Sequence, residues 1–358
     1  EFFKDKKRLP NYLISGSVVE KADLDNDGDL DLFIGGRLTP KKYPNPTSSK
    51  ILENKKGYFV DVTKKVAKGL NDLGLVTSAN WVDINKDNRL DLVIVGEWMP
   101  ISVFIQNKNG KFSKQKMDGL NNTEGWYYSI KSADFDLDGD MDLVVGNLGL
   151  NYKYKASKES PFQVHSFDFD KNGVKDIVLS YYEHGQVYPV RGRSCSLEQM
   201  PSLGKKFPTF ESFGDSNLNT IYGKDLDKAL NLKAYTFASV YIENIDGQSF
   251  KQHKLHQLSQ VSSINNILID DFDADENLDI LVSGNLYSSE IETPRNDASI
   301  GLFLKGDGKN NFKAVPVNKS GFYVPFDSKS MEKIQVGNSH AVIVGNNSAK
   351  LQIIERNR

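Results

Sequence analysis

A nine-residue acidic segment that occurs five times constrains the fold of this chain more than any other feature. Its first copy is Asp23-Leu24-Asp25-Asn26-Asp27-Gly28-Asp29-Leu30-Asp31, and the apolar run Leu32-Phe33-Ile34-Gly35-Gly36 follows at once. Carboxylates held this close together repel each other, so the segment needs a cation. Hard oxygen ligands on a flexible loop favour Ca²⁺, which accepts roughly six to eight oxygens in irregular geometry. The segment therefore predicts a calcium-binding loop.

The other copies keep the spacing and also precede apolar runs. They occupy residues 83–91, 134–142, 168–176 and 271–279. The copy at 168–176 is the weakest, because Gly173 is followed by no acid before Asp176. In the last copy Glu276 replaces the expected glycine, which costs about 1–2 kcal/mol if the same turn is kept.

The predicted metal-binding positions are the alternate residues of each copy. They are Asp23, Asp25, Asp27, Asp29 and Asp31; Asp83, Asn85, Asp87, Arg89 and Asp91; Asp134, Asp136, Asp138, Asp140 and Asp142; Asp168, Asp170, Asn172 and Asp176; and Asp271, Asp273, Asp275, Asn277 and Asp279.

The sequence after each copy excludes an EF-hand. An EF-hand needs a bidentate Glu at its twelfth position and a helix on each side, whereas the twelfth position of the first copy is Ile34 within a predicted strand. The pattern instead resembles the FG-GAP or VCBS repeat family. That resemblance implies a β-propeller in which a calcium loop joins the first two strands of each four-stranded blade.

Composition is consistent with one large domain spanning residues 1–358. The chain is 39% hydrophobic, and its net charge of −2 shows no bias towards nucleic acid. It contains no apolar run long enough to span a bilayer, and Cys195 is its only cysteine, which excludes an internal disulfide. Calcium sites of this kind, with Kd on the order of 10⁻⁴–10⁻³ M, fill outside cells. We therefore expect an extracellular or cell-surface protein.

The two ends of the chain predict how a propeller would close. Segments at 332–336, 341–345 and 351–354 predict the first three strands of a last blade, and residues 1–6 predict its fourth. Six repeats can then be counted, and a seventh is possible if 161–258 holds two. The copy at 168–176 is alternatively a hairpin turn within the third blade.

The alternation typical of strands breaks between residues 194 and 230. Short segments with helical spacing, joined by Gly and Pro, predict a small helical insertion on one face of the propeller. With the irregular third repeat, this insertion resembles the second propeller of large cell-surface proteins of Bacteroidetes-type bacteria. The resemblance implies a longer parent protein at the outer membrane, with a possible lipid anchor upstream.

Two classes of function remain open. The first is a non-enzymatic binding or scaffold module that recognises a polysaccharide or an outer-membrane protein. The second is a carbohydrate-active enzyme similar to polysaccharide lyases, which would need a base beside cationic groups on one face. Candidate ligand-binding residues are Trp98, Trp126, His184, Tyr188, Arg191 and Arg193. No catalytic motif links them, and the repeated carboxylates are not expected to be catalytic, so binding is favoured.

Overall fold

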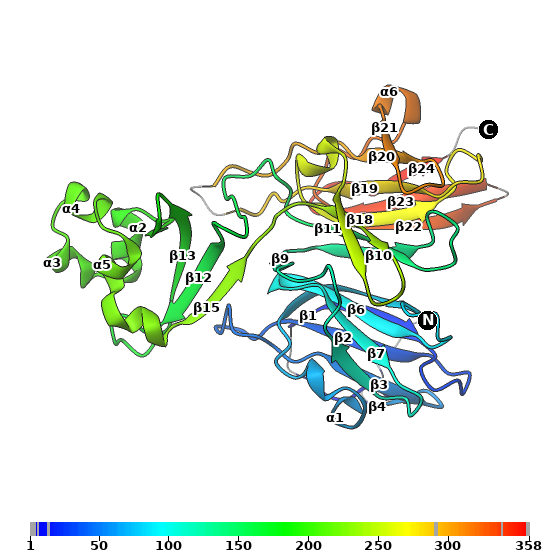
Figure 1. The fold of residues 1–358 in the computed structure, drawn as a ribbon, viewed down its shortest axis with the longest axis horizontal. Helices are drawn as coiled ribbons and strands as arrows, with labels where there is room; N and C mark the ends of the chain where they lie inside the picture. Colours follow the sequence, from blue (N-terminus) through cyan, green and yellow to red (C-terminus); the bar gives the residue numbers. More distant parts are fainter. Residues whose placement is uncertain (1–4, 6, 13–14, 290–292, 338, 356–358) are drawn as a thin grey trace.

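The computed structural model describes residues 5, 7–12, 15–289, 293–337 and 339–355. It is an all-β structure of antiparallel sheets with few helices, as predicted (Figure 1). Sheet one contains β1 (Ser15–Ala22), β2 (Asp31–Leu38), β3 (Lys50–Lys55) and β4 (Tyr58–Asp61). Sheet two contains β5 (Leu75–Val82), β6 (Asp91–Met99), β7 (Ser102–Gln106) and β8 (Phe112–Gln115), with β9 (Gly125–Trp126) added to β6.

The remaining sheets repeat this order with one interruption. Sheet three contains β10 (Ser129–Ala133), β11 (Asp142–Gly146), β16 (Val240–Asn244) and β17 (Phe250–Lys254). Sheet four is inserted in the sequence between β11 and β16 of sheet three. It contains β12 (Phe162–Phe167), β13 (Asp176–Glu183), β14 (Gln186–Pro189) and β15 (Leu230–Ala234). Sheet five contains β18 (Ile264–Asp270), β19 (Asp279–Gly284), β20 (Leu302–Gly306) and β21 (Phe312–Val315). Sheet six contains β22 (Ser328–Val336), β23 (Ser339–Asn346) and β24 (Gln352–Glu355).

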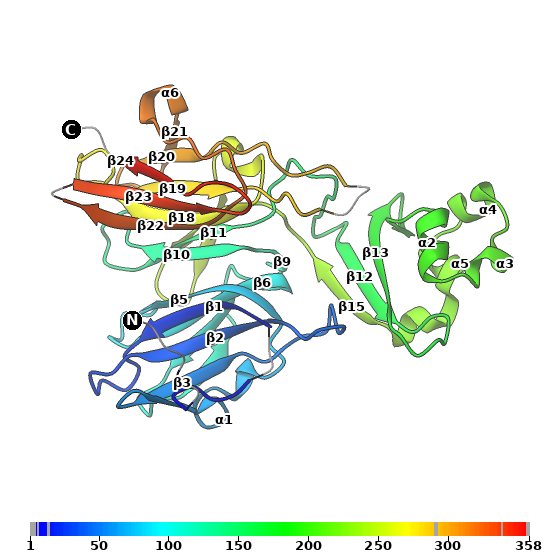
Figure 2. The same ribbon diagram turned by 180° about the vertical axis from the view of Figure 1, so that it is seen from behind.

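Sheets one, two, three, five and six pack face to face in that order (Figure 2). The β-branched and aromatic runs after the acidic loops form their second strands, and apolar clusters fill each interface. In sheet two the second strand, β6, contains Val93 and Val95 facing sheet three and Leu92 and Ile94 facing sheet one, all fully buried. A strand buried on both faces explains why these runs are continuously apolar.

The first strands of these sheets approach a common axis. Burial raises the pKa of the Glu20 carboxyl on β1, and the charges of Lys131 on β10 and Glu332 on β22 also act on it. The carboxyl is therefore near strands from the first, third and last stacked sheets. This arrangement is the one expected of propeller blades, whose first strands line the centre.

The predicted strand at residues 1–6 lies largely outside the described residues, and residues 7–12 follow it in sequence. The Arg8 carbonyl accepts a hydrogen bond from Phe59 N–H at 2.8 Å, so this segment runs beside β4 of sheet one. Asp5 forms an ion pair with Arg8. Sheet six has the three strands predicted for it, and in the described residues no fourth strand pairs with β24. Closure through a shared last blade is therefore not observed in this part of the chain.

Sheet four and its helices form a unit that projects from the stack (Figure 1). The copy at 168–176 is not a hairpin turn within the third blade, because this loop joins β12 to β13, the first two strands of a separate sheet. In the stacked sheets no described strand pairs with the outer edge of the first strand, whereas β15 pairs with that edge of β12. This pairing gives the order β14-β13-β12-β15, so the unit is not another blade of the stack.

The helices of this unit follow β14 and pack on sheet four. They are α2 (Arg193–Gln199), α3 (Leu203–Lys206), α4 (Phe210–Gly214), α5 (Leu218–Tyr222) and the 3₁₀ turn η2 (Gly223–Lys228). Their apolar side chains cluster around Val178 of β13. The short helices elsewhere are α1 (Thr63–Val66), η1 (Lys68–Leu70), η3 (Gln257–Gln260) and α6 (Val317–Ser320). Aromatic contacts, including the stacked rings of Trp98 and Phe162 at 5.9 Å, join the unit to the stacked sheets.

Acid is expected to destabilise sheet four through His165. This side chain of β12 is buried with no hydrogen-bond partner for either ring nitrogen, and burial followed by the charge of Lys233 lowers its pKa to about 4. The unfolded chain therefore binds a proton that the native state does not between pH 4 and the ordinary value of 6.5. Stability should fall as pH drops through that window, by at most about 1.4 kcal/mol per pH unit.

Urea unfolding across this pH range provides the measurement. His165→Phe should remove the part of the pH slope that arises from this side chain. His184→Gln, at the exposed β13–β14 turn, should leave the slope as in the wild type. A wild-type slope in His165→Phe would contradict the assignment.

Candidate metal loops and the groove beside them

All five acidic segments form the same loop between the first and second strands of a sheet. The fourth and sixth residues of each loop have left-handed backbone conformations. At the fourth position these are Asn26, Lys86, Leu137, Lys171 and Ala274, with φ of 59°, 59°, 61°, 62° and 62°. At the sixth they are Gly28, Asn88, Gly139, Gly173 and Glu276, with φ of 89°, 61°, 85°, 87° and 71°. One backbone geometry is thus kept with and without glycine.

The first aspartate of each loop holds this geometry. Its carboxylate accepts a hydrogen bond from the backbone N–H of the sixth residue. The distance is 3.0 Å from Asp23 to Gly28 and from Asp134 to Gly139, and 3.1 Å from Asp271 to Glu276. Such side-chain to backbone bonds are what short acidic residues supply in tight turns. These hydrogen bonds therefore close the loop without a bound ion.

The ninth aspartate connects each stacked loop to the third strand of its sheet. Asp91 accepts hydrogen bonds from Ile84 N–H in the loop at 3.2 Å and from Gln106 N–H on β7 at 2.8 Å. Asp31, Asp142 and Asp279 bond the equivalent backbone groups of Asn54, Asn244 and Gly306. All four carboxylates are buried, and burial raises the pKa of Asp91, Asp142 and Asp279 to about 6. The ninth position therefore has a structural role in these loops.

Four of the loops bring carboxylate oxygens within 4.8 Å of one another, close enough to share a metal ion. The groups are Asp23, Asp25 and Asp27; Asp134, Asp136 and Asp138; Asp168, Asp170 and Asp176; and Asp271, Asp273 and Asp279. The ninth residue joins the group only in the last two loops. These are oxygen-only donor sets of the type that hard divalent cations prefer.

The loop at 134–142 fits a cation best. One oxygen of each of Asp134, Asp136 and Asp140 is buried without a hydrogen-bond partner, and Asp140 is only 2% exposed. Lys86 approaches Asp140 at 3.6 Å, but those three oxygens stay unpaired. Leaving a buried carboxylate oxygen unsatisfied is costly, and a bound divalent ion would remove that cost. The residues of this loop therefore fit a metal ion.

The loop at 83–91 differs because it contains its own cation. The Arg89 guanidinium pairs with Asp87, and its Nε donates to the Gln106 carbonyl at 3.1 Å. Guanidinium has only donors, so the Arg89 side chain cannot ligate a metal, and a metal ligand at this position would have to be the backbone carbonyl. In the loop at 271–279, the Lys305 ammonium pairs with Asp273 and with Asp275.

Amide side chains from one sheet bind the loop of the preceding sheet. Gln106 of sheet two donates to the Leu24 carbonyl at 3.0 Å. Asn244 of sheet three donates to the Ile84 carbonyl at 2.9 Å, and Asn310 of sheet five donates to Asp136 at 2.7 Å. The loops are thus fixed both within their sheets and between them.

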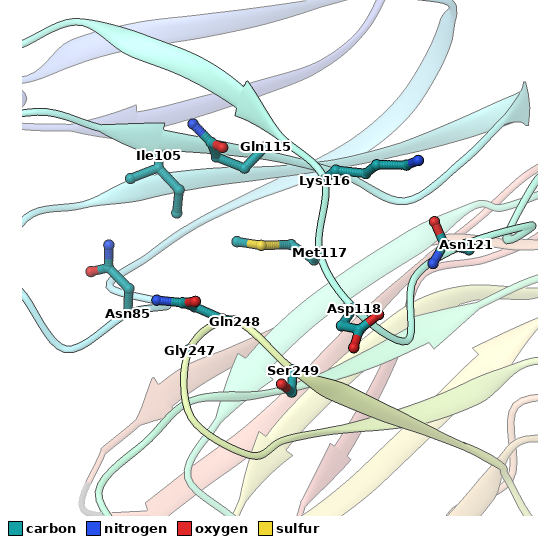
Figure 3. Close-up of a pocket in the computed structure, with 10 residues that line it drawn as sticks. All are labelled: Asn85, Ile105, Gln115, Lys116, Met117, Asp118, Asn121, Gly247, Gln248 and Ser249. Carbon is teal, nitrogen blue, oxygen red and sulfur yellow. The ribbon is translucent and has the colours of Figure 1, made fainter.

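A groove of about 670 Å³ lies beside the 83–91 loop, between sheets two and three (Figure 3). Sheet two contributes Ile105 and the segment from Gln115 to Asp118. Sheet three contributes the β16–β17 turn, Gly247 to Ser249. Asn85 comes from the loop itself, and Asn121 completes the lining. Four of the lining side chains are amides, and one ammonium and one carboxylate are present.

The two tryptophan candidates for ligand binding pack against each other, with Trp98 buried and Trp126 half-buried. Trp98 is 4% exposed, and its ring packs edge-on against Trp126 at 5.0 Å. The Trp98 Nε1–H donates to the Tyr43 hydroxyl at 2.7 Å. The expectation that Trp98 lies where a sugar could stack is therefore wrong, because the residue connects the stacked sheets to sheet four.

The polar candidates lie in the projecting unit but do not converge on one site. His184 is at the exposed turn between β13 and β14, and Tyr188 lies beside Tyr181, with ring centroids 6.1 Å apart. Arg193 donates to the carbonyls of Phe207 and Pro208, so it holds the helices together. Arg191 precedes α2 and its carbonyl accepts from the Ser196 hydroxyl.

Comparison with known proteins agrees with the loop geometry. The profile of the FG-GAP-like repeat family matches residues 23–94 and 83–145. Residues 23–145 are FG-GAP-like repeats. The loops at 168–176 and 271–279 lie outside the matched residues but share the backbone of the FG-GAP-like loops. No curated protein matches the chain significantly.

Among solved structures, one match is the crystal structure of the V. cholerae biofilm matrix protein Bap1. The alignment covers 97% of this chain and 70% of that chain, with 9% sequence identity and a TM-score of 0.34. No helix in the described part of this chain is long and apolar enough to cross a membrane.

Sequence reasoning missed two features of these loops. The left-handed fourth position carries Leu137 and Ala274, which give no signal of positive φ. The capping amides Gln106 and Asn244 were also not predicted. For Asn244 a sequence signal was available, because Asn54-Lys55-Lys56-Gly57 and Asn244-Ile245-Asp246-Gly247 share their spacing. In both, the Asn side-chain oxygen accepts from the Gly N–H at 2.7 Å.

Asn244→Ala is expected to destabilise the protein by about 2–4 kcal/mol. The buried amide donates to two carbonyls and accepts from Gly247, and those partners would be left unsatisfied. Urea unfolding measures the change, with the exposed Asn109→Ala as control. A loss below about 0.5 kcal/mol would show that the amide does not hold the loop.

Glu276→Gly is expected to stabilise the protein by about 1 kcal/mol. Glu276 has a φ of 71°, which disfavours a side chain, whereas its backbone N–H bond to Asp271 is retained by glycine. Gly139→Ala at the equivalent position should destabilise instead. The difference in unfolding free energy measures both effects, and a destabilised Glu276→Gly would indicate that its side chain contributes contacts.

Proposed function

We propose that this chain is a calcium-stabilised, extracellular binding or scaffold module of a bacterial cell-surface protein. The observation that carries the proposal is the FG-GAP-like loop at 134–142, with three buried carboxylate oxygens that lack partners. The same loop geometry recurs in every stacked sheet except the last. Ions in these loops would stiffen the stack rather than take part in chemistry.

The loops favour calcium and an extracellular location. Carboxylates at alternate positions offer several oxygens on a backbone that is irregular and partly exposed, which suits the larger ion. Open sites of this type bind weakly, so they require calcium at about 10⁻⁴–10⁻³ M. Such concentrations are found outside cells, where a scaffold would act.

The ligand of the module is proposed to be a polysaccharide or an outer-membrane protein. The groove between sheets two and three is at the same end of the stack as the calcium loops, since Asn85 belongs to both. Polar, uncharged side chains dominate it, which suits recognition by hydrogen bonds. No observation favours the lyase alternative, because the cationic and aromatic candidates near residue 190 are separated or already bonded within the described fold.

Calcium removal provides the first test. An ion that binds only the native state stabilises it by about 2.7 kcal/mol per site at one hundred times its Kd. Chelation should therefore lower the Tm. Asp136→Asn should remove part of the calcium-dependent stabilisation, because it weakens the loop at 134–142. Asp87→Asn makes the same chemical change in the loop that contains Arg89, and it should leave that stabilisation nearly unchanged.

A Tm that does not change with chelator would contradict the calcium assignment. The binding role needs a separate measurement, namely retention of the chain on immobilised extracellular polysaccharides and on outer-membrane proteins. Retention on either supports the proposal. Release of unsaturated oligosaccharides during incubation, followed by ultraviolet absorbance, would overturn it in favour of the enzyme.

A further inference from the structure

We infer that the groove between sheets two and three binds a neutral sugar residue of a glycan. This inference rests on the proposed binding function and makes it more specific.

The size of the groove suits one or two sugar rings. Its volume of about 670 Å³ lies within the range of roughly 300–1,000 Å³ that is typical of small-ligand sites. Its walls come from two sheets and from the 83–91 loop, so an occupant would contact three separate segments. Because the groove is open at the surface, it can admit a sugar residue from the end or from the middle of a glycan chain.

The lining pairs amides with an apolar surface. Asn85, Gln115 and Gln248 lie around the side chains of Ile105 and Met117 (Figure 3). Each amide has both donors and an acceptor, which matches the hydroxyl groups of a sugar. The apolar side chains would lie against the C–H face of the ring. In the described structure the Gln248 side chain has no hydrogen-bond partner, so its amide is available to a ligand.

The charges of the lining favour a neutral ligand. The lining contains one positive side chain, Lys116, and one negative side chain, Asp118, so their charges cancel and the groove has no net charge. A uronate-rich polysaccharide would meet a carboxylate as well as an ammonium. Selectivity for acidic glycans normally depends on clustered cations, because guanidinium and ammonium groups recognise carboxylates.

The walls of the groove are fixed before a ligand arrives. Asp118 N–H donates to the Gln248 carbonyl at 3.0 Å, and Phe250 N–H donates to the Asp118 carbonyl at 2.9 Å. Gly247 lies so close to the loop that a Cβ there would be 2.7 Å from Asn85 Cα. A rigid site loses less entropy on binding. Since this loop holds Arg89 as its cation, the position of Asn85 does not require calcium.

The test is titration calorimetry with neutral oligosaccharides of glucose, galactose and mannose, and with oligogalacturonate as the acidic counterpart. We expect a neutral oligosaccharide to bind and to keep binding in chelator at a temperature below the chelated Tm. Gln115→Ala and Gln248→Ala should each weaken binding about tenfold, the effect of losing one well-formed hydrogen bond. Gln248→Trp should block the groove. The control is Gln335→Ala on β22.

Three results would overturn the inference. These are absence of binding by every neutral oligosaccharide, tighter binding of oligogalacturonate, and wild-type affinity in both alanine variants and in Gln248→Trp. Each variant is checked for a wild-type Tm in calcium, because all the substituted residues are exposed. If the chain is retained on polysaccharide while these variants bind normally, only the groove is wrong and the proposed function stands.

Discussion

The hydrogen bonds of the ninth aspartate are the interaction on which the stacked sheets depend. In sheets one, two, three and five, a single carboxylate buried at the start of the second strand bonds a backbone N–H in the loop and another on the third strand. It therefore fixes the loop, the second strand and the third strand relative to one another. The bond donors are backbone groups, so the arrangement tolerates wide variation in the neighbouring side chains. This tolerance allows one geometry to recur in repeats of different sequence.

The stack extends this local arrangement from sheet to sheet. Apolar second strands supply the packing energy between faces, while Gln106, Asn244 and Asn310 bind the loop of the preceding sheet. Sheet four lacks this relationship because β15 covers the edge of β12. It is joined to the stack by aromatic packing through Trp98, Trp126 and Phe162 instead.

The sequence predicts local structure here better than it predicts which segments distant in sequence lie side by side. The acidic loops, the strands after them and the three strands of sheet six all follow from spacing and alternation, because each depends on neighbours in sequence. The pairing of β11 with β16 spans the whole of sheet four, although the likeness of 240–244 to the third strand of sheet one did indicate it. In the described residues, the course of 7–12 beside β4 depends on a backbone bond from Phe59, on Arg8 over the Tyr58 ring and on contacts of Tyr12. No periodic pattern encodes such contacts.

Differences among the loops follow from how their carboxylates are neutralised. In the loop at 83–91 a guanidinium from the chain does so, and in the loop at 271–279 the Lys305 ammonium pairs with two of the acids. In the loop at 134–142 Lys86 reaches only one acid, and three oxygens remain buried and unpaired. A covalently attached cation is always present, whereas an ion binds according to its concentration. A chain that combines both would keep part of its rim ordered without calcium and stiffen the rest where calcium is abundant.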